Sequence, residues 1–201
     1  MRAAALLCCL LALAGAAAGA SSSDSRTVYL VRHGEAYKNV QSGKAADDPQ
    51  FDKLTEQGRQ QAAAAGMRLR GVGLTAVAVA PEQRTRDTAL AITSRAMLWP
   101  ASVDPAFTSK AYEGESPEAR ATRGIAALRR FLLRTRGDVA VVTHGHLSSL
   151  MTAKLTGVAL TPEVVKNELI PGGVIKLRVT GFGTSGEKWV KLESDGQVRD
   201  D

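Results

Sequence analysis

The sequence contains very little cysteine and few aromatic residues. Only two of its 201 residues are cysteines, Cys8 and Cys9, and Phe, Trp and Tyr together account for 4%. Both cysteines lie near the N-terminus, so removal of that segment would leave a mature chain without a thiol. For such a chain, disulfide bonds, thiol catalysis and cysteine-ligated metal are excluded.

The sequence also lacks a fixed repeat and a dense run of basic residues. Its 26 Lys and Arg residues exceed its 20 Asp and Glu residues, giving a net charge of +6, but they are spread along the chain without interleaved aromatic residues. This mild excess favours anionic ligands, and no nucleic-acid partner is expected. With 44% hydrophobic and 23% charged residues, the composition predicts one globular domain and excludes collagen-like, coiled-coil and wholly disordered chains.

The longest apolar run lies at the N-terminus, where Arg2 precedes an Ala- and Leu-rich stretch over residues 3–18. An Ala-Gly-Ala sequence then leads into a serine-rich segment. This pattern predicts a secretory signal peptide over residues 1–20, cleaved before Ser21 and followed by a polar leader over residues 21–26. An uncleaved membrane anchor is the alternative, although the run is short for a span of about 20 residues. Cleavage predicts a secreted or periplasmic protein without stable membrane insertion.

Short apolar, β-branched runs alternate with segments of helical periodicity in the rest of the chain. Strands are expected over residues 26–31, 74–80 and 138–143, with a hairpin near 174–179 and 188–192; helices are expected after Thr55, over about 84–97, from Pro117 to near Gly137, and from about His146 to Gly157. This alternation predicts a three-layer α/β/α domain with a mostly parallel central sheet over residues 27–193, before a polar tail at 194–201.

Charged side chains follow the carboxyl ends of the predicted strands. Arg32 and His33 follow the first strand, Arg84 opens the helix after the second, and His144 and His146 follow the third. Ligands of such sheets bind beyond these strand ends, so Arg32, His33, Arg84 and His144 are expected to converge. Guanidiniums, imidazoles and helix N-termini suit a dianionic phosphoryl group. The neighbouring arginines disfavour the imidazolium, which keeps His33 neutral and nucleophilic.

Four segments of the chain carry short motifs. Arg-His-Gly-Glu at residues 32–35 is followed by Asn39, and the other motifs lie at residues 54–62 (LTEQGRQQA), 81–89 (PEQRTRDTA) and 142–145 (VTHG). The first resembles the signature Arg-His-Gly-Glu-Thr-x-x-Asn of the phosphoglycerate mutase-like histidine phosphatase superfamily, and the other three are similar to further motifs of this family, in the family's order. The resemblance covers roughly residues 27–179.

The resemblance implies a phosphatase that hydrolyses a small phosphomonoester through a phosphohistidine on His33. Arg32, Arg84 and His144 are implied to hold the phosphoryl oxygens. Asn39 and Gly145 are implied to bind the substrate. No cofactor is implied, and no metal site is expected, because the His-x-His pair at 144–146 lacks a third strong ligand. The oligomeric state is left open.

The proton donor is the least defined part of this interpretation. Mutase-type members carry a glutamate between the second arginine and the second histidine, where Ser109 stands in this chain. Glu113 is the favoured donor because it lies just before the helix that Ser116 caps, and Asp104 and Glu115 are the other candidates. A mutase-like phosphotransferase remains an alternative function, as does a catalytically weak protein that binds a phosphorylated ligand without an effective acid.

Overall fold

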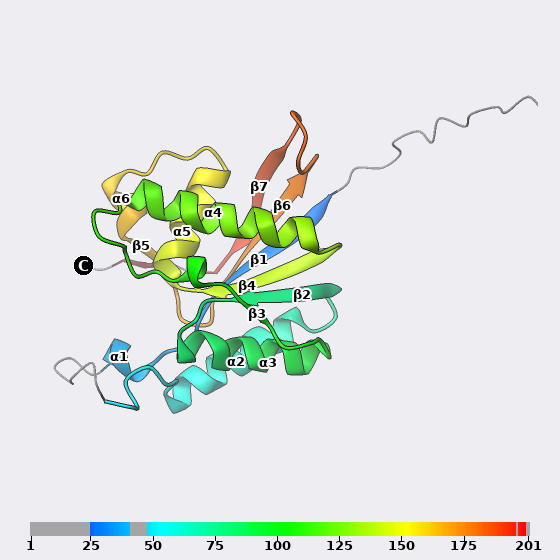
Figure 1. The fold of residues 1–201 in the computed structure, drawn as a ribbon. Coiled ribbons are helices and arrows are strands. Elements are labelled where there is room, and N and C mark those ends of the chain that lie inside the picture. The colour runs from blue at the N-terminus through cyan, green and yellow to red at the C-terminus, as the bar shows by residue number, and fades with distance from the viewer. Residues whose placement is uncertain (1–24, 41–47, 196, 200–201) are drawn as a thin grey trace, which may run out of the picture.

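A six-stranded sheet separates two layers of helices in the computed structural model, which describes residues 25–40, 48–195 and 197–199 (Figure 1). The strands of the sheet are β1 (Arg26–Arg32), β2 (Leu74–Val79), β3 (Ser102–Val103), β4 (Asp138–Thr143), β6 (Val174–Thr180) and β7 (Lys188–Ser194). The helices are α1 (Tyr37–Val40), α2 (Glu56–Leu69), α3 (Gln83–Ala96), the 3₁₀ helix η1 (Pro105–Phe107), α4 (Pro117–Arg134), α5 (Gly145–Leu155) and α6 (Pro162–Lys166).

The sheet has the order β3-β2-β4-β1-β6-β7 and is mostly parallel. Neighbours among β3, β2, β4 and β1 are parallel, whereas β6 and β7 form the expected antiparallel hairpin beside β1. The carboxyl ends of β1 and β4 therefore lie side by side, with Arg32 paired to Thr143 in register. The next residue continues this pairing, because the backbone N–H of His33 donates to the carbonyl of Thr143 at 3.0 Å.

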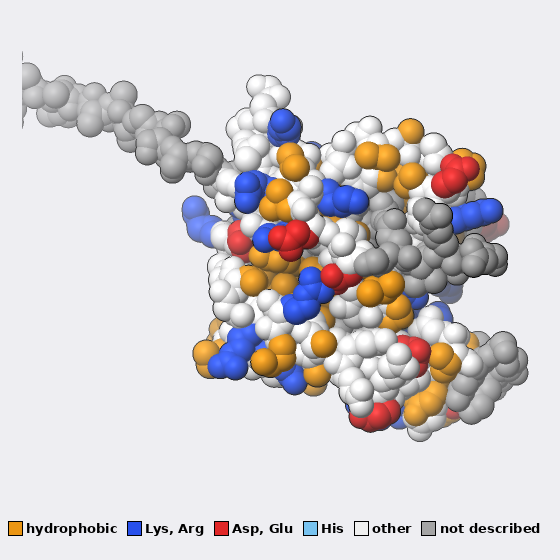
Figure 2. All heavy atoms as spheres, turned by 180° about the vertical axis from the view of Figure 1, so that it is seen from behind, with side chains coloured by type: hydrophobic (Ala, Val, Ile, Leu, Met, Phe, Trp, Pro, Cys, Tyr) orange, Lys and Arg blue, Asp and Glu red, His pale blue; other side chains and the backbone are white. Residues whose placement is uncertain are grey.

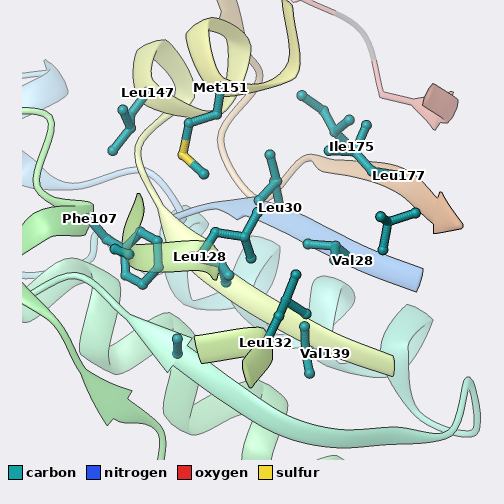
Figure 3. Close-up of a cluster of buried hydrophobic side chains, with 14 of the residues drawn as sticks. Val28, Leu30, Phe107, Leu128, Leu132, Val139, Leu147, Met151, Ile175 and Leu177 are labelled. Atoms are coloured by element: carbon teal, nitrogen blue, oxygen red, sulfur yellow. The ribbon is translucent and has the colours of Figure 1, made fainter. Parts of the chain in front are cut away.

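Both faces of the central strands are buried, because each is covered by a pair of helices. On one face, Leu30 of β1 and Val141 of β4 pack with Leu128 of α4 and Met151 of α5, as Figure 3 shows for Leu30, Leu128 and Met151. Each of these side chains is fully buried, which contributes about 1.5–3 kcal/mol per large aliphatic side chain relative to exposure.

The opposite face of the sheet is covered by α2 and α3. Here Val31 of β1 and Val142 of β4 pack with Ala65 of α2 and Ile92 of α3. The arrangement confirms the three-layer α/β/α fold with a mostly parallel sheet, and it fixes the strand ends from which the functional side chains project.

The expected elements all form, and the structure adds short ones that periodicity did not predict. These are α1, β3, η1, α6, and a two-stranded ribbon of β5 (Asn167–Leu169) and β8 (Gln197–Arg199). The ribbon takes part of the expected polar tail at 194–201 into antiparallel pairing with β5. The predicted signal peptide and residues 21–24 of the polar leader lie outside the described residues, whereas Arg26, the last residue of the predicted leader, begins β1. Within the described part of the chain, no helix is long and apolar enough to cross a membrane.

Basic side chains are dispersed on the face turned away from the view in Figure 1. Figure 2 shows this face, where Lys and Arg side chains lie between apolar and uncharged ones and several have acidic neighbours. On this face, the described cations do not merge into one continuous positive surface.

The loop after β1 passes unusually close to the first turn of α2. A Cβ atom on Gly58 would lie 1.9 Å from the carbonyl oxygen of Glu35, and one on Gly34 would lie 2.2 Å from the carbonyl oxygen of Gly58. Thr55 caps α2 beside this contact, since its hydroxyl accepts from the N–H of Gly58 at 2.9 Å. The motif at residues 54–62 thus places a helix start directly against the loop that carries His33.

We predict that Gly58→Ala destabilises the protein, because its methyl group would overlap backbone rather than a movable side chain. The free energy of unfolding should fall by about 1–3 kcal/mol, which is the usual cost of overpacking. Gln57→Ala is the matched control, since Gln57 is the exposed neighbour in the same helical turn, and its effect should stay within about 0.5 kcal/mol. Urea denaturation of both variants measures the difference, and equal stabilities would contradict the close contact.

Candidate active site

His33 lies buried at the carboxyl end of β1, with 3% of its surface exposed. Its Nδ1 is 2.6 Å from the carbonyl oxygen of Gly34. A carbonyl oxygen only accepts, so Nδ1 carries the proton. Its Nε2 accepts a hydrogen bond from Nε of Arg84 at 3.1 Å. The ring is therefore held as the tautomer whose Nε2 lone pair points at the guanidinium.

The surroundings of His33 oppose its protonation. Burial lowers its pKa well below the ordinary value, and the charges of His144, Arg84 and Arg32 lower it further, against a smaller opposite effect of the hydrogen bond to Gly34. The imidazole is consequently neutral near neutral pH. A neutral imidazole with an oriented lone pair is a competent nucleophile.

Arg84 connects the two histidines of the site through different nitrogen atoms of one guanidinium. Its Nε contacts His33, its NH2 donates to Nδ1 of His144 at 3.1 Å, and its NH1 pairs with Asp52. Asp52 also accepts from the backbone N–H of Gln83 at 2.6 Å, so it fixes both the first turn of α3 and the arginine. The guanidinium is thus aimed at both imidazoles.

His144 follows β4 and is also buried, with 4% of its surface exposed. Because Arg84 donates to its Nδ1, the proton of the neutral ring is on Nε2, and this N–H donates to Glu82 at 3.0 Å. Burial lowers the pKa of His144, the Glu82 carboxylate raises it, and the charges of Arg84 and Lys38 lower it. The rings of His144 and His33 meet edge to face, with centroids 5.2 Å apart.

Glu82 is the residue immediately before α3. One carboxylate oxygen accepts from His144 and the other accepts from the hydroxyl of Thr108. Burial alone would raise the pKa of Glu82, but these hydrogen bonds and the attraction of His144 hold it well below its usual range. Glu82 is therefore a carboxylate that carries no proton at neutral pH.

Arg32 supplies the second guanidinium beside this cluster. Its NH1 donates to the carbonyl of Leu169 at 2.5 Å and pairs with Glu168 at 3.0 Å, both on β5. Gly145 leaves the space that Arg32 fills, since a Cβ atom there would lie 2.8 Å from the Cδ of Arg32. Gly145 also begins α5, whose N-cap residue His144 makes no side-chain capping hydrogen bond. Helix N–H groups at such an end favour an anion.

Threonine and glutamine side chains hold the His33 loop in place. The hydroxyl of Thr88 in α3 accepts from the N–H of Gly34 at 3.1 Å and donates to the carbonyl of Arg84 at 2.9 Å. The amide oxygen of Gln61 in α2 accepts from the N–H of Glu35 at 2.7 Å. The motifs at 54–62 and 81–89 therefore act by fixing the loop and the arginine relative to each other.

The structure brings His33, Arg32, Arg84 and His144 together, as the sequence predicted, and it places the candidate acids elsewhere. Glu113 is exposed and makes no hydrogen bond or ion pair with any other described residue. Asp104 caps η1 and pairs with Arg130, and Glu115 is bound by Arg123 through two hydrogen bonds of 2.8 and 2.9 Å. None of these three carboxylates forms a hydrogen bond or ion pair with His33 or His144, so their catalytic role stays a prediction.

Two other expected residues take local positions. The side-chain oxygen of Asn39 accepts from the N–H of Ala36 at 3.0 Å, which closes the loop around α1. His146 lies half-buried in the first turn of α5, where burial lowers its pKa first and the charge of Arg120 lowers it further. Among the described residues, no group of three or more His, Cys, Asp or Glu side chains is arranged to hold a metal ion.

Family comparison agrees with this geometry. Residues 28–108 and 98–190 match the model of the histidine phosphatase superfamily (branch 1), which together is more than half of the chain. The chain belongs to this superfamily. A 62-residue stretch is 44% identical to a probable phosphoglycerate mutase, GpmB, of Erwinia tasmaniensis; the stretch is 31% of this chain and only 28% of that relative.

Solved histidine phosphatase-like structures share the fold at low sequence identity. A structure named mycobacterial hydrolase 1 is 19% identical, with a TM-score of 0.72 over 87% of this chain and 100% of the other. A mycobacterial glucosyl-3-phosphoglycerate phosphatase in complex with VO3 is 19% identical, with a TM-score of 0.70 over 85% and 100%. A putative alpha-ribazole-5'-P phosphatase of Escherichia coli is 20% identical, with a TM-score of 0.66 over 87% and 98%.

Four residues that contact or face the site of this superfamily member were not predicted from the sequence. Glu82 lies inside the motif at 81–89, where it could have been considered as the nearest acid to Arg84. Asp52 and Thr108 carry no local signal, because their partners are distant in sequence. Lys38 precedes Asn39, and partial burial and then the charge of Arg84 lower its pKa, while Asp52 and Glu82 raise it.

The lowered pKa values of His33, His144 and His146 predict how the folded protein titrates. We expect the NMR signals of all three imidazoles to titrate with midpoints below pH 6.5, and the midpoint of His33 to be the lowest of the three. The unfolded chain takes up protons near pH 6.5 that the folded chain does not bind, so the free energy of unfolding should fall as the pH drops below about 6.5. A His33 signal that titrates at or above pH 6.5 would contradict this assignment.

Proposed function

We propose that the protein is a phosphatase that hydrolyses a small phosphomonoester through a covalent phosphohistidine on His33. The observation that carries the proposal is the position of Arg84. Its guanidinium donates to Nε2 of His33 and to Nδ1 of His144, so both free ring nitrogens face one cation. A phosphoryl group bound by that cation lies within reach of the nucleophile.

The first step transfers the phosphoryl group to the enzyme. The ester's phosphoryl oxygens take over the hydrogen bonds that Arg84 gives to the imidazoles, and Arg32 and the N-terminus of α5 add further donors. The Nε2 lone pair of His33 forms the N–P bond while the P–O bond to the leaving group breaks. The proton of His33 stays on Nδ1, which keeps donating to the carbonyl of Gly34. The fixed donors stabilise the charge on the equatorial oxygens without reorganisation.

The second step releases phosphate. A water molecule attacks the phosphorus atom, the N–P bond breaks, and its electron pair returns to Nε2 of His33. The low pKa of His33 supports both steps. In the first step the neutral imidazole is the nucleophile, and in the second a weakly basic imidazole leaves the phosphorus atom readily. The reaction as proposed uses no metal and no organic cofactor.

A mutase-like phosphotransferase is the second candidate function. The local similarity to a probable phosphoglycerate mutase favours it, and it would need the phosphohistidine to survive until a second hydroxyl group replaces water. The names of the two phosphatases with the same fold favour hydrolysis. Adding an alcohol acceptor during turnover separates the two, because a mutase would form a new ester while a phosphatase would release only phosphate.

Replacing the nucleophile should abolish turnover. We expect His33→Ala to fold and to release no phosphate from an aryl phosphate, while wild-type enzyme quenched during turnover carries acid-labile, alkali-stable phosphate. His146→Ala is the matched control, because it removes a histidine that contacts neither His33 nor Arg84 by any hydrogen bond and should retain most of the activity. Thermal unfolding checks that both variants fold. Near-wild-type activity in His33→Ala, or no bound phosphate in the wild type, would refute the covalent mechanism.

We also propose that the protein is exported and acts as a secreted or periplasmic enzyme. The support is the sequence of residues 1–20, with its basic start, apolar core and small residues before Ser21. N-terminal sequencing of the exported protein should begin at Ser21. Ala20→Glu, which puts a large charged side chain at the cleavage site, should accumulate the uncleaved form. A wild-type mature protein that retains Met1 would contradict the proposal.

A further inference from the structure

The hydrolysis proposed above needs a proton for the leaving oxygen, and the pair formed by His144 and Glu82 has the geometry to handle one. The Nε2–H of His144 donates to Glu82 at 3.0 Å, and its Nδ1 faces the guanidinium that also contacts His33. One nitrogen of His144 is therefore bound to a carboxylate. The other faces Arg84, the guanidinium proposed to bind the phosphoryl group.

We propose that His144 is the proton donor to the leaving group and that Glu82 is the positioning residue that orients and charges it. This inference rests on the proposed phosphatase function and assigns a role that the sequence had given to Glu113. Glu82 acts through His144 and does not itself reach the reacting atoms.

The proton balance closes over the two steps. In the first, the imidazolium of His144 gives its Nδ1 proton to the ester oxygen, which keeps the electron pair of the breaking P–O bond and leaves as an alcohol. His144 then has the neutral tautomer that the structure contains, with its proton on Nε2. In the second, Nδ1 takes a proton from the attacking water as the O–P bond forms and the N–P bond to His33 breaks. His144 ends as the imidazolium with which it began.

In this arrangement, Glu82 is better suited to orient His144 than to donate a proton to the leaving group itself. Both of its oxygens accept hydrogen bonds, one from Thr108 and one from His144, so it has no proton to transfer. A carboxylate on Nε2 selects the tautomer with a free Nδ1 and stabilises the imidazolium when it forms, as a buried carboxylate does for a catalytic imidazole elsewhere.

The charge of His144 is set by groups on three elements that surround it. Glu82 at the start of α3 favours the imidazolium, whereas Arg84 of α3 and Lys38 of α1 oppose it, and the ring of His33 after β1 packs edge to face against it. In the free protein, burial and the cations lower the pKa of His144 by more than Glu82 raises it. A bound dianion adds negative charge beside Nδ1, so substrate binding shifts the balance toward the protonated form.

The test compares Glu82→Gln on two substrates, an alkyl phosphate such as glycerol phosphate and an activated aryl phosphate. A poor leaving group needs its proton and a good one does not. We expect the variant to lose about 10²–10⁴-fold in kcat/KM on the alkyl ester and less than about tenfold on the aryl ester. Glu82→Asp should recover part of the alkyl activity. Glu118→Gln, an exposed carboxylate in the first turn of α4, is the control and should change neither.

The pH profile distinguishes this role from a structural one. The basic limb of kcat on the alkyl ester should report deprotonation of His144 in the complex. Removing the carboxylate lowers that pKa, so the limb should move to lower pH in Glu82→Gln and return toward the wild type in Glu82→Asp. A merely structural defect would lower both substrates' rates together and leave the limb in place.

A second variant keeps the test valid if Glu82→Gln fails to fold. Thr108→Val removes only the hydroxyl that holds the other carboxylate oxygen, and should give a smaller loss that is still selective for the alkyl ester. Equal losses on both esters, or an alkyl-selective loss in Glu113→Gln instead, would overturn the proposal. The phosphatase function would survive either result as long as the wild type forms phosphohistidine and turns over the aryl ester.

Discussion

The contact of one guanidinium with two imidazoles determines the arrangement of the site. Arg84 donates to His33 and His144 at 3.1 Å each, and by doing so it leaves each ring only one tautomer. The remaining ring N–H groups then need acceptors, which Gly34 and Glu82 provide. The fold supplies this geometry through two parallel strands that end side by side and a helix that begins opposite them.

Several features of the chain keep that guanidinium in position. Thr88 ties the backbone of Arg84 to the His33 loop, and the mutual approach of Gly34 and Gly58 holds that loop against α2. These contacts leave no room for a side chain at either glycine. The motifs by which the family is recognised in this sequence are thus largely the parts that fix the backbone around His33.

The strands, the main helices and the clustering of His33, Arg32, Arg84 and His144 could be predicted because their signals are local. Runs of β-branched residues mark β1 and β4, and charged residues follow directly after them. Glu82 could not be assigned in the same way, because its partner His144 is 62 positions away and its role depends on which ring nitrogen faces it. Glu113 was favoured over Glu115 as the acid, but of these two only Glu115 is bound by an arginine. Such distinctions depend on tertiary contacts that no spacing encodes.

The ion pair between Arg84 and Asp52 has a consequence for the exchange of ligands. A buried arginine without a counter-charge is strongly unfavourable. If the departure of phosphate left the arginine unpaired, release of the phosphate would therefore be opposed. Here an internal carboxylate, Asp52, stands beside the guanidinium, and its side chain is partly exposed. In the proposed hydrolysis, Asp52 would neutralise the arginine as the phosphate ion departs and would give way to the next phosphoryl group. The protein would thereby carry its own substitute for the ligand, so that a firmly bound dianion can still be exchanged.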